Sequence, residues 1–171
     1  RYGEHGGITA RTLLSWPLAL PGQAEAAQAQ AAEGLTQARA LGHVQTLGFS
    51  LAIVAVLQRH LREIGPAESY ARELIELAER YGMALWRVVG DLVLGWVQCQ
   101  RGDAAGLGLI EAACAASAFA MPSTEATFLS FLIEAQLQLG LAEPALQNIE
   151  RALPMAQERQ EFYLLPELWR M

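Results

Sequence analysis

Glycine and proline interrupt this sequence at intervals close to one helix length, and this spacing constrains the fold more than any other feature. Both residues commonly mark helix ends, because Gly adopts backbone conformations that other residues avoid and Pro lacks an amide hydrogen. Almost no segment alternates polar and apolar residues with period two, so strands are not expected. The breaks lie at Leu20-Pro21-Gly22, Gly42-His43, Ile64-Gly65-Pro66, Tyr81-Gly82-Met83, Arg101-Gly102-Asp103, Met121-Pro122-Ser123, Gly140-Leu141 and Arg159-Gln160. The sequence therefore predicts an all-α chain of about nine helical segments.

Two kinds of helical segment alternate along the chain. The first kind is amphipathic, as in Ala67 to Arg80 and Ala142 to Arg159, with charged residues on the face away from the apolar stripe. In the first of these segments the predicted apolar stripe is Tyr70, Leu74, Leu77 and Tyr81. The second kind is apolar around more of its circumference and is expected to lie between neighbours, as in Val44 to Leu61, Leu85 to Gln100 and Thr124 to Leu139.

This alternation is an internal repeat. Aligning Gly42 with Gly82 gives an offset of 40 residues, and aligning Gly102 with Gly140 gives an offset of 38. Gly102 is expected to end one helix and Asp103 to cap the next. Small residues are expected where the paired helices cross, at Gly95, Ala135, Ala145 and Ala152. The chain is thus predicted to fold as four helical hairpins and the start of a fifth, stacked to bury a common core.

The charged residues exclude several activities. All 12 basic residues are Arg, and the net charge is −6. Without Lys there is no Walker A lysine, no Schiff base and no Ser-Lys pair. Because the arginines are scattered, binding to nucleic acid is not expected. His5, His43 and His60 are too dispersed for a zinc site, and no motif for a catalytic triad occurs. We therefore expect no metal, no cofactor and no catalytic residue. His43, after Gly42, is interpreted as a cation at a helix C-terminus.

The length and composition favour a single domain over residues 1–171, since 53% of the residues are apolar. The longest aliphatic run, Leu51 to Leu57, is too short to cross a bilayer, and the N-terminus lacks the pattern of a signal peptide. We expect a cytoplasmic protein in which Cys99 and Cys114 are reduced and buried. The start at Arg1 suggests a fragment of a longer multidomain protein.

The segment "LGWVQCQRGDAAGLGLIEAAC" resembles the tetratricopeptide repeat. Leu94, Gly95, Gly102 and Cys114 match that pattern, whereas Leu107 stands where the pattern has Ala. The next copy, in which Ile133 replaces the first small residue, matches through Leu132, Gly140, Ala145 and Ala152. The resemblance implies a right-handed α-α superhelix.

A wider resemblance covers nearly the whole chain. The stretches "RYGEH", "ALGH", "ERYGMALW", "LGW" and "ERQEFYLLPELWRM" are similar to the C-terminal tetratricopeptide-like arrays of large bacterial regulators. Those regulators join an AAA-like or STAND-type ATPase to the array, together with an adenylate/guanylate cyclase domain or a DNA-binding regulator domain. The chain departs from the family at Gly6, where the family has an acidic residue, and at Pro17 and Pro154, which should kink or shorten their helices.

The resemblance implies a protein-interaction and scaffolding module without enzymatic activity of its own. Its partner would be a protein segment or a neighbouring domain of the same parent chain. The alternative is a sensor domain that binds a small inducer molecule. The tetratricopeptide register places candidate groove residues on the first helix of two successive hairpins, at Trp96, Cys99, Gln100, Thr127, Ser130, Glu134 and Gln138. The other tryptophans, Trp16, Trp86 and Trp169, are expected to pack in the core.

Overall fold

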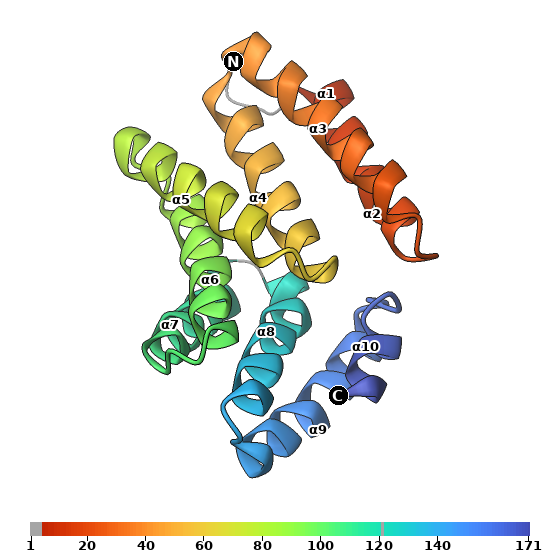
Figure 1. The fold of residues 1–171 in the computed structure, drawn as a ribbon, viewed down its shortest axis with the longest axis vertical. Coiled ribbons are helices and arrows are strands. Elements are labelled where there is room, and N and C mark those ends of the chain that lie inside the picture. The colour runs from red at the N-terminus through yellow and green to blue at the C-terminus, as the bar shows by residue number, and fades with distance from the viewer. Residues whose placement is uncertain (1–4, 121) are drawn as a thin grey trace. The chain divides into compact units, whose positions relative to one another are not determined.

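The computed structural model describes residues 5–120 and 122–171, and every regular element in these ranges is a helix (Figure 1). The elements are α1 (Gly6–Leu13), α2 (Ser15–Ala19), α3 (Ala24–Leu41), α4 (Val44–His60), α5 (Ile64–Tyr81), α6 (Ala84–Gln100), α7 (Ala105–Ala120), the 3-10 turn η1 (Pro122–Thr124), α8 (Glu125–Gln138), α9 (Ala142–Glu158) and α10 (Leu165–Arg170). The expected segments correspond to the pair α1–α2 and to α3 through α10. The all-α prediction is confirmed for the described residues, and none of their helices is long and apolar enough to span a membrane.

The chain contacts group into two compact units, Arg1–Gly90 and Asp91–Met171. The boundary between the units lies inside α6. The first unit contains α1 to α5 with the start of α6, and the second contains the rest of α6 with α7 to α10. The expectation of one domain over residues 1–171 stays a prediction.

Left-handed residues mark most turns between helices, and successive ones lie 20 residues apart except for the 38 residues between Gly102 and Gly140. Within the described ranges they are Gly22, Gly42, Arg62, Gly82, Gly102, Gly140 and Gln160, with φ from 60° to 82°. At most of these turns the next amide donates to the carbonyl five residues earlier, as from Met83 N to Ala78 O at 2.9 Å. This 6→1 bond defines the Schellman motif, which satisfies carbonyls at the end of a helix. One helix and one turn thus occupy about half of the 40-residue offset found in the sequence.

The break expected at Ile64-Gly65-Pro66 is wrong, because the turn lies earlier, at residues 61–63. Arg62 adopts φ 63°, and the amide of Glu63 donates to Gln58 O at 2.9 Å. Pro66 falls in the first turn of α5, where amides have no intrahelical partner and the missing N–H costs little. The hydrogen bonds of the turn therefore fix the helix end, although Arg is strained in this conformation.

Proline affects two helices differently. The first helix is interrupted between Leu13 and Ser15, just before Pro17, as expected. The shortening expected at Pro154 does not occur, because α9 continues to Glu158. Pro154 lies on the exposed side of α9, where water can satisfy the carbonyl that loses its amide partner.

Hydroxyl groups and a glycine form a close contact in the first unit. Thr12 and Ser50 are completely buried, and their oxygens are 3.3 Å apart, which joins α1 to α4. A Cβ atom at Gly34 of α3 would lie 2.5 Å from Thr12 Oγ1. Only glycine lets α3 approach α1 this closely.

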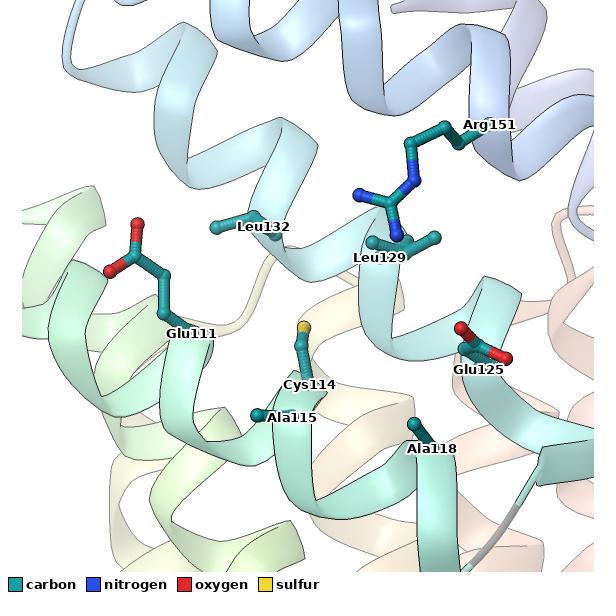
Figure 2. Close-up of a pocket in the computed structure, with 8 residues that line it drawn as sticks. All are labelled: Glu111, Cys114, Ala115, Ala118, Glu125, Leu129, Leu132 and Arg151. Atoms are coloured by element: carbon teal, nitrogen blue, oxygen red, sulfur yellow. The ribbon is translucent and has the colours of Figure 1, made fainter.

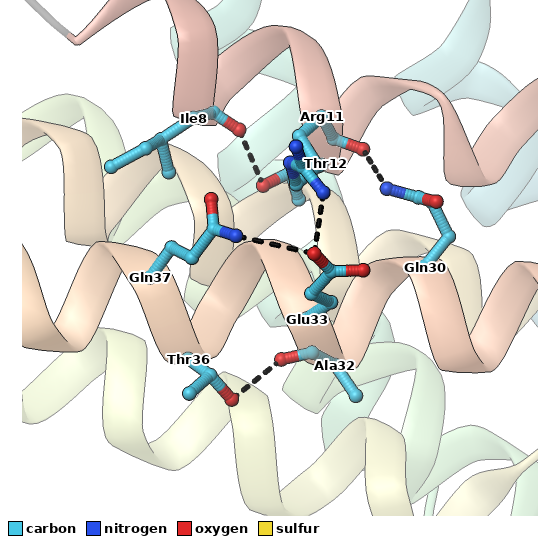
Figure 3. A network of polar contacts seen from close by, with 8 residues as sticks. All are labelled: Ile8, Arg11, Thr12, Gln30, Ala32, Glu33, Thr36 and Gln37. Atoms are coloured by element: carbon cyan, nitrogen blue, oxygen red, sulfur yellow. Dashed lines mark hydrogen bonds and ion pairs between the residues drawn. The ribbon is translucent and has the colours of Figure 1, made fainter.

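A polar network holds the outer surfaces of α1 and α3 together (Figure 3). Arg11 forms an ion pair with Glu33, which also accepts a hydrogen bond from Gln37 Nε2 at 3.2 Å. Gln30 Nε2 donates to the carbonyl of Arg11 at 3.3 Å. The network is exposed, so its main effect is to orient the helices and its contribution to stability is small.

The buried stripe of α5 consists mainly of alanine and differs from the expected one. Its fully buried residues are Ala67, Ala71, Leu74 and Ala78. Tyr81, which the sequence pattern places in this stripe, is 53% exposed because the helix ends there. The small residues allow α5 to pack closely against α4, and the outer face carries an ion pair between Glu68 and Arg72 at 2.7 Å.

Glycine also sets the crossing of α6 and α7 in the second unit. A Cβ at Gly95 would lie 2.6 Å from Gly106 O, and a Cβ at Gly106 would come even closer to Gly95 O. Gly106 therefore supplies the small residue that the repeat pattern has at Leu107. The other expected crossing residues, Ala135, Ala145 and Ala152, are completely buried.

The ends of two helices test two capping predictions. Asp103 Oδ1 accepts a hydrogen bond from Ala105 N at 2.9 Å, which confirms its role before α7. The interpretation of His43 as a helix C-terminal cation is wrong, since His43 is the N-cap of α4. Its Nδ1 lies 3.4 Å from the donor Thr46 N and 2.9 Å from Thr46 Oγ1.

Candidate binding pocket

A pocket of about 230 Å³ lies among α7, α8 and α9 of the second unit (Figure 2). Alanine and leucine side chains form its apolar part, and charged side chains together with one thiol complete it. The lining residues are Glu111, Cys114, Ala115 and Ala118 of α7, Glu125, Leu129 and Leu132 of α8, and Arg151 of α9.

Helical periodicity explains why these residues line one space. The α7 residues follow the spacing i, i+3, i+4 and i+7, and the α8 residues follow i, i+4 and i+7, so each set occupies one face of its helix. The two helices are in contact. Ala115 and Ala118 have one-carbon side chains that do not fill the space opposite Leu129 and Leu132. The pocket results from this mismatch of side-chain size.

The charges of the pocket differ in how far the protein satisfies them. Glu125 is paired with Arg159, whose Nη2 lies 2.9 Å from Oε2. Arg151 donates to the neutral Asn148 Oδ1 at 3.1 Å and has no carboxylate partner among the described residues. Glu111, which is exposed, has no hydrogen bond or ion pair within those residues. One negative and one positive charge thus remain available at the pocket.

Cys114 contributes to the pocket as a neutral group. Burial raises the pKa of its thiol to about 12, and Glu111 and Glu125 add to the increase, whereas Arg151 opposes it. A thiol with this pKa stays protonated at neutral pH and is a poor nucleophile. Cys99 is also a free thiol, fully buried, and burial raises its pKa. The expectation of buried, unpaired cysteines is confirmed for Cys99, and Cys114 is partly buried.

The structure does not bring the predicted groove residues to one accessible surface. Trp96, Cys99 and Ser130 are completely buried, so their side chains present no surface to a partner. Glu134 is 7% exposed, Gln100 and Thr127 are partly exposed, and Gln138 is exposed. None of the predicted groove residues lines the pocket.

Thr127 takes part in a different polar cluster. Its hydroxyl donates to Glu161 Oε2 at 3.0 Å and lies 2.8 Å from the hydroxyl of Tyr163. These contacts tie the α9–α10 turn to α8. Burial raises the pKa of Glu161, although its hydrogen bonds and Arg159 oppose the shift. Glu161 Oε1 is buried without a hydrogen-bond partner.

The four tryptophans differ in their surroundings. Trp96 is completely buried and is therefore a core residue. Trp16 and Trp86 are partly exposed; Trp86 packs edge-on against Phe49. Trp169 is 70% exposed, so its expected place in the core is wrong. The short helix α10 buries only the face that carries Leu168, and Trp169 lies outside that face.

Sequence reasoning missed the pocket residues for a physical reason. The stripe from Glu111 to Ala118 is visible as helical periodicity, and so is the stripe from Glu125 to Leu132. Periodicity assigns residues to a face of their own helix, but it contains no information on which faces oppose each other or how well their side chains fill the interface.

Known proteins provide no further assignment. No protein-family model, no curated protein and no solved structure matches this chain. Among the described residues, no group of three or more His, Cys, Asp or Glu side chains is arranged to hold a metal ion.

Proposed function

We propose that this chain is a tetratricopeptide-like repeat module that binds a segment of another protein or of a neighbouring domain. In this proposal the hairpins form a right-handed superhelix within a bacterial signal-transduction or transcription-regulating ATPase, and binding at the module biases the output of that protein. The module itself performs no catalysis. The resemblance of the repeat and the regular helix–turn spacing support the repeat architecture.

The pocket among α7, α8 and α9 is the observation that carries the proposal. Its volume of about 230 Å³ is smaller than the ~300–1,000 Å³ of sites that enclose a whole drug-sized ligand. It suits one or two inserted side chains, which is how helical grooves commonly engage a protein partner. The pocket is therefore large enough for one or two side chains of a protein segment and too small to enclose a drug-sized molecule.

Peptide selection tests this proposal. We expect a phage-displayed library of random short peptides to yield clones that bind the whole chain. Replacing Ala115 with Trp fills the pocket and should abolish their binding. Ala112 is an exposed alanine of α7 that does not line the pocket, so Ala112→Trp is the matched control and should bind normally.

Two results would reject the proposal. One is a set of clones that binds the Ala115→Trp variant as well as the wild type, because the pocket would then not be the site. The other is a thermal shift with a sugar or another metabolite, lost in Ala115→Trp, in the absence of any binding peptide. A ligand of the folded state raises its melting temperature by mass action, so this second result would favour the inducer sensor.

A further inference from the structure

The charges around the pocket form an ordered pattern. Figure 2 shows Glu111 and Glu125 at opposite ends of the pocket, with Arg151 extending from α9 toward the space between them. Glu111 and Ala118, which lies at the Glu125 end, are seven residues apart on α7, about 10 Å by helical rise. This length matches two turns of a bound helix or a few residues of an extended strand.

Ion pairs within the protein determine which of these charged side chains can pair with a ligand. Arg159 already neutralises Glu125, with 2.9 Å between Nη2 and Oε2. Glu111 and Arg151 have no ion-pair partner among the described residues. A complementary ligand therefore needs a cationic group at the Glu111 end and an anionic group near Arg151.

The apolar lining sets the third requirement. Ala115 and Ala118 are exposed and offer an apolar surface, the almost fully buried Leu129 and Leu132 lie beneath the space beside them, and the partly buried neutral thiol of Cys114 adds to this lining. Burial of apolar surface supplies most of the affinity in such contacts, whereas exposed charge pairs mainly set orientation and specificity. A ligand without an apolar group would leave the apolar lining uncovered, and a ligand with charges of one sign would pair with only one of the two available charges.

We propose that the pocket binds a protein segment in which an apolar side chain is flanked by one basic and one acidic residue, the basic residue facing Glu111 and the acidic residue facing Arg151. This inference rests on the proposed function and adds the chemistry and the orientation of the partner segment. It also excludes two other classes of ligand: nucleic acids, which Glu111 would repel, and uniformly basic peptides, which Arg151 would repel.

Charge-reversal variants of the full chain test the inference. Peptide clones selected on the wild type should contain the apolar residue between one basic and one acidic residue. Glu111→Arg and Arg151→Glu should each weaken these clones roughly three- to tenfold, the size expected when an exposed charge pair becomes a like-charge pair. Glu150 of α9 is exposed and lies outside the pocket, so Glu150→Arg is the control that changes the net charge by the same amount as Glu111→Arg. This control should bind the clones with the affinity of the wild type.

The double variant gives the sharpest result. Glu111→Arg combined with Arg151→Glu reverses the polarity of the pocket, so a new selection should yield peptides with the basic and acidic positions exchanged. Circular dichroism of every variant checks that the helices are intact, and a variant with altered helicity is replaced by Glu111→Gln or Arg151→Gln, which should weaken the clones in the same direction.

The possible failures are distinguishable. If Ala115→Trp abolishes binding but the charge variants bind the same peptides with unchanged affinity, the inference is overturned and the proposed function stands. If Ala115→Trp has no effect, both fail. A thermal shift with a free amino acid, lost in Ala115→Trp and not matched by any peptide, would show that the pocket takes a small zwitterion, and this also overturns the inference.

Discussion

Both units place glycine where two helices approach closely, but the atoms opposite the glycine differ. In the first unit, Gly34 faces the side chain of Thr12, although backbone atoms of Thr12 would also lie 3.1 Å from an added Cβ. In the second unit, Gly95 and Gly106 face each other's carbonyl oxygens. A side chain can rotate or be removed by mutation, whereas a carbonyl moves only with its helix. The second contact should therefore be the less tolerant of the two.

Gly106→Ala should produce the largest effect, because the new methyl group forces α6 and α7 apart. We expect a loss of about 3 kcal/mol in the free energy of unfolding, at the upper end of typical overpacking costs. Chemical denaturation followed by circular dichroism measures it. Gly108 lies on the same helix with no atom within 4 Å of an added Cβ. As the control, Gly108→Ala should stabilise the chain by roughly 0.5–1 kcal/mol. Similar values for the two variants would disprove the close approach of α6 and α7.

Gly34→Ala should cost less, about 1–2 kcal/mol, because Thr12 can adjust in part. The contact with Thr12 Oγ1 predicts that the two positions are coupled. In a double-mutant cycle, Gly34→Ala with Thr12→Ala should destabilise the chain by less than the sum of the single variants. Additive effects would mean that the backbone of α1, and not the Thr12 hydroxyl, limits the approach of α3.

The two units also differ in a buried polar group, and this difference should make their stabilities depend on pH differently. Thr12 and Ser50 do not ionise near neutral pH, whereas Glu161 in the second unit does. Since burial raises the pKa of Glu161 above its ordinary 4.5, the folded state holds its proton more tightly than the unfolded state. Its contribution to stability is most favourable below that ordinary value and declines as the pH rises through the folded-state pKa.

The Glu161→Gln substitution should therefore change the melting temperature least at low pH, and the difference from the wild type should increase as the pH rises. The amide keeps an acceptor for Thr127 and removes the ionisation. Melting temperatures measured from acid to neutral pH should show the wild type losing stability relative to the variant. Thr12→Val is the control from the first unit and should shift the curve by a constant amount. A wild type and variant that stay parallel at all pH values would contradict the raised pKa.

Particular residues show how far the sequence predicts the fold. Gly42, Gly82, Gly102 and Gly140 are recognisable as turns because glycine adopts the left-handed conformation of a helix end more readily than any other residue. The turn at Arg62 is predicted too late in the chain, since an arginine gives no such signal and the nearby Gly65-Pro66 gives a strong one. The existence of helices is therefore predicted well, and so are the helix ends that glycine marks, whereas of the two turns with a left-handed non-glycine residue the one at Gln160 is predicted and the one at Arg62 is misplaced.

The candidate site shows the opposite outcome. The repeat register assigns Trp96 to a groove, but its side chain is completely buried. The pocket depends instead on Ala115 and Ala118 lying opposite leucines of another helix. These are contacts between residues distant in sequence, and a repeat register does not contain them.

The order of glycine, proline and apolar residues was enough to specify that the chain is helical and where most of its helices lie, because backbone conformation and amphipathic periodicity are local properties of the chain. The packed structure was needed for the rest. It selected which faces meet, which charges keep a partner and where small side chains leave a pocket, because these depend on shape and distance between helices that the order of residues along one helix does not record.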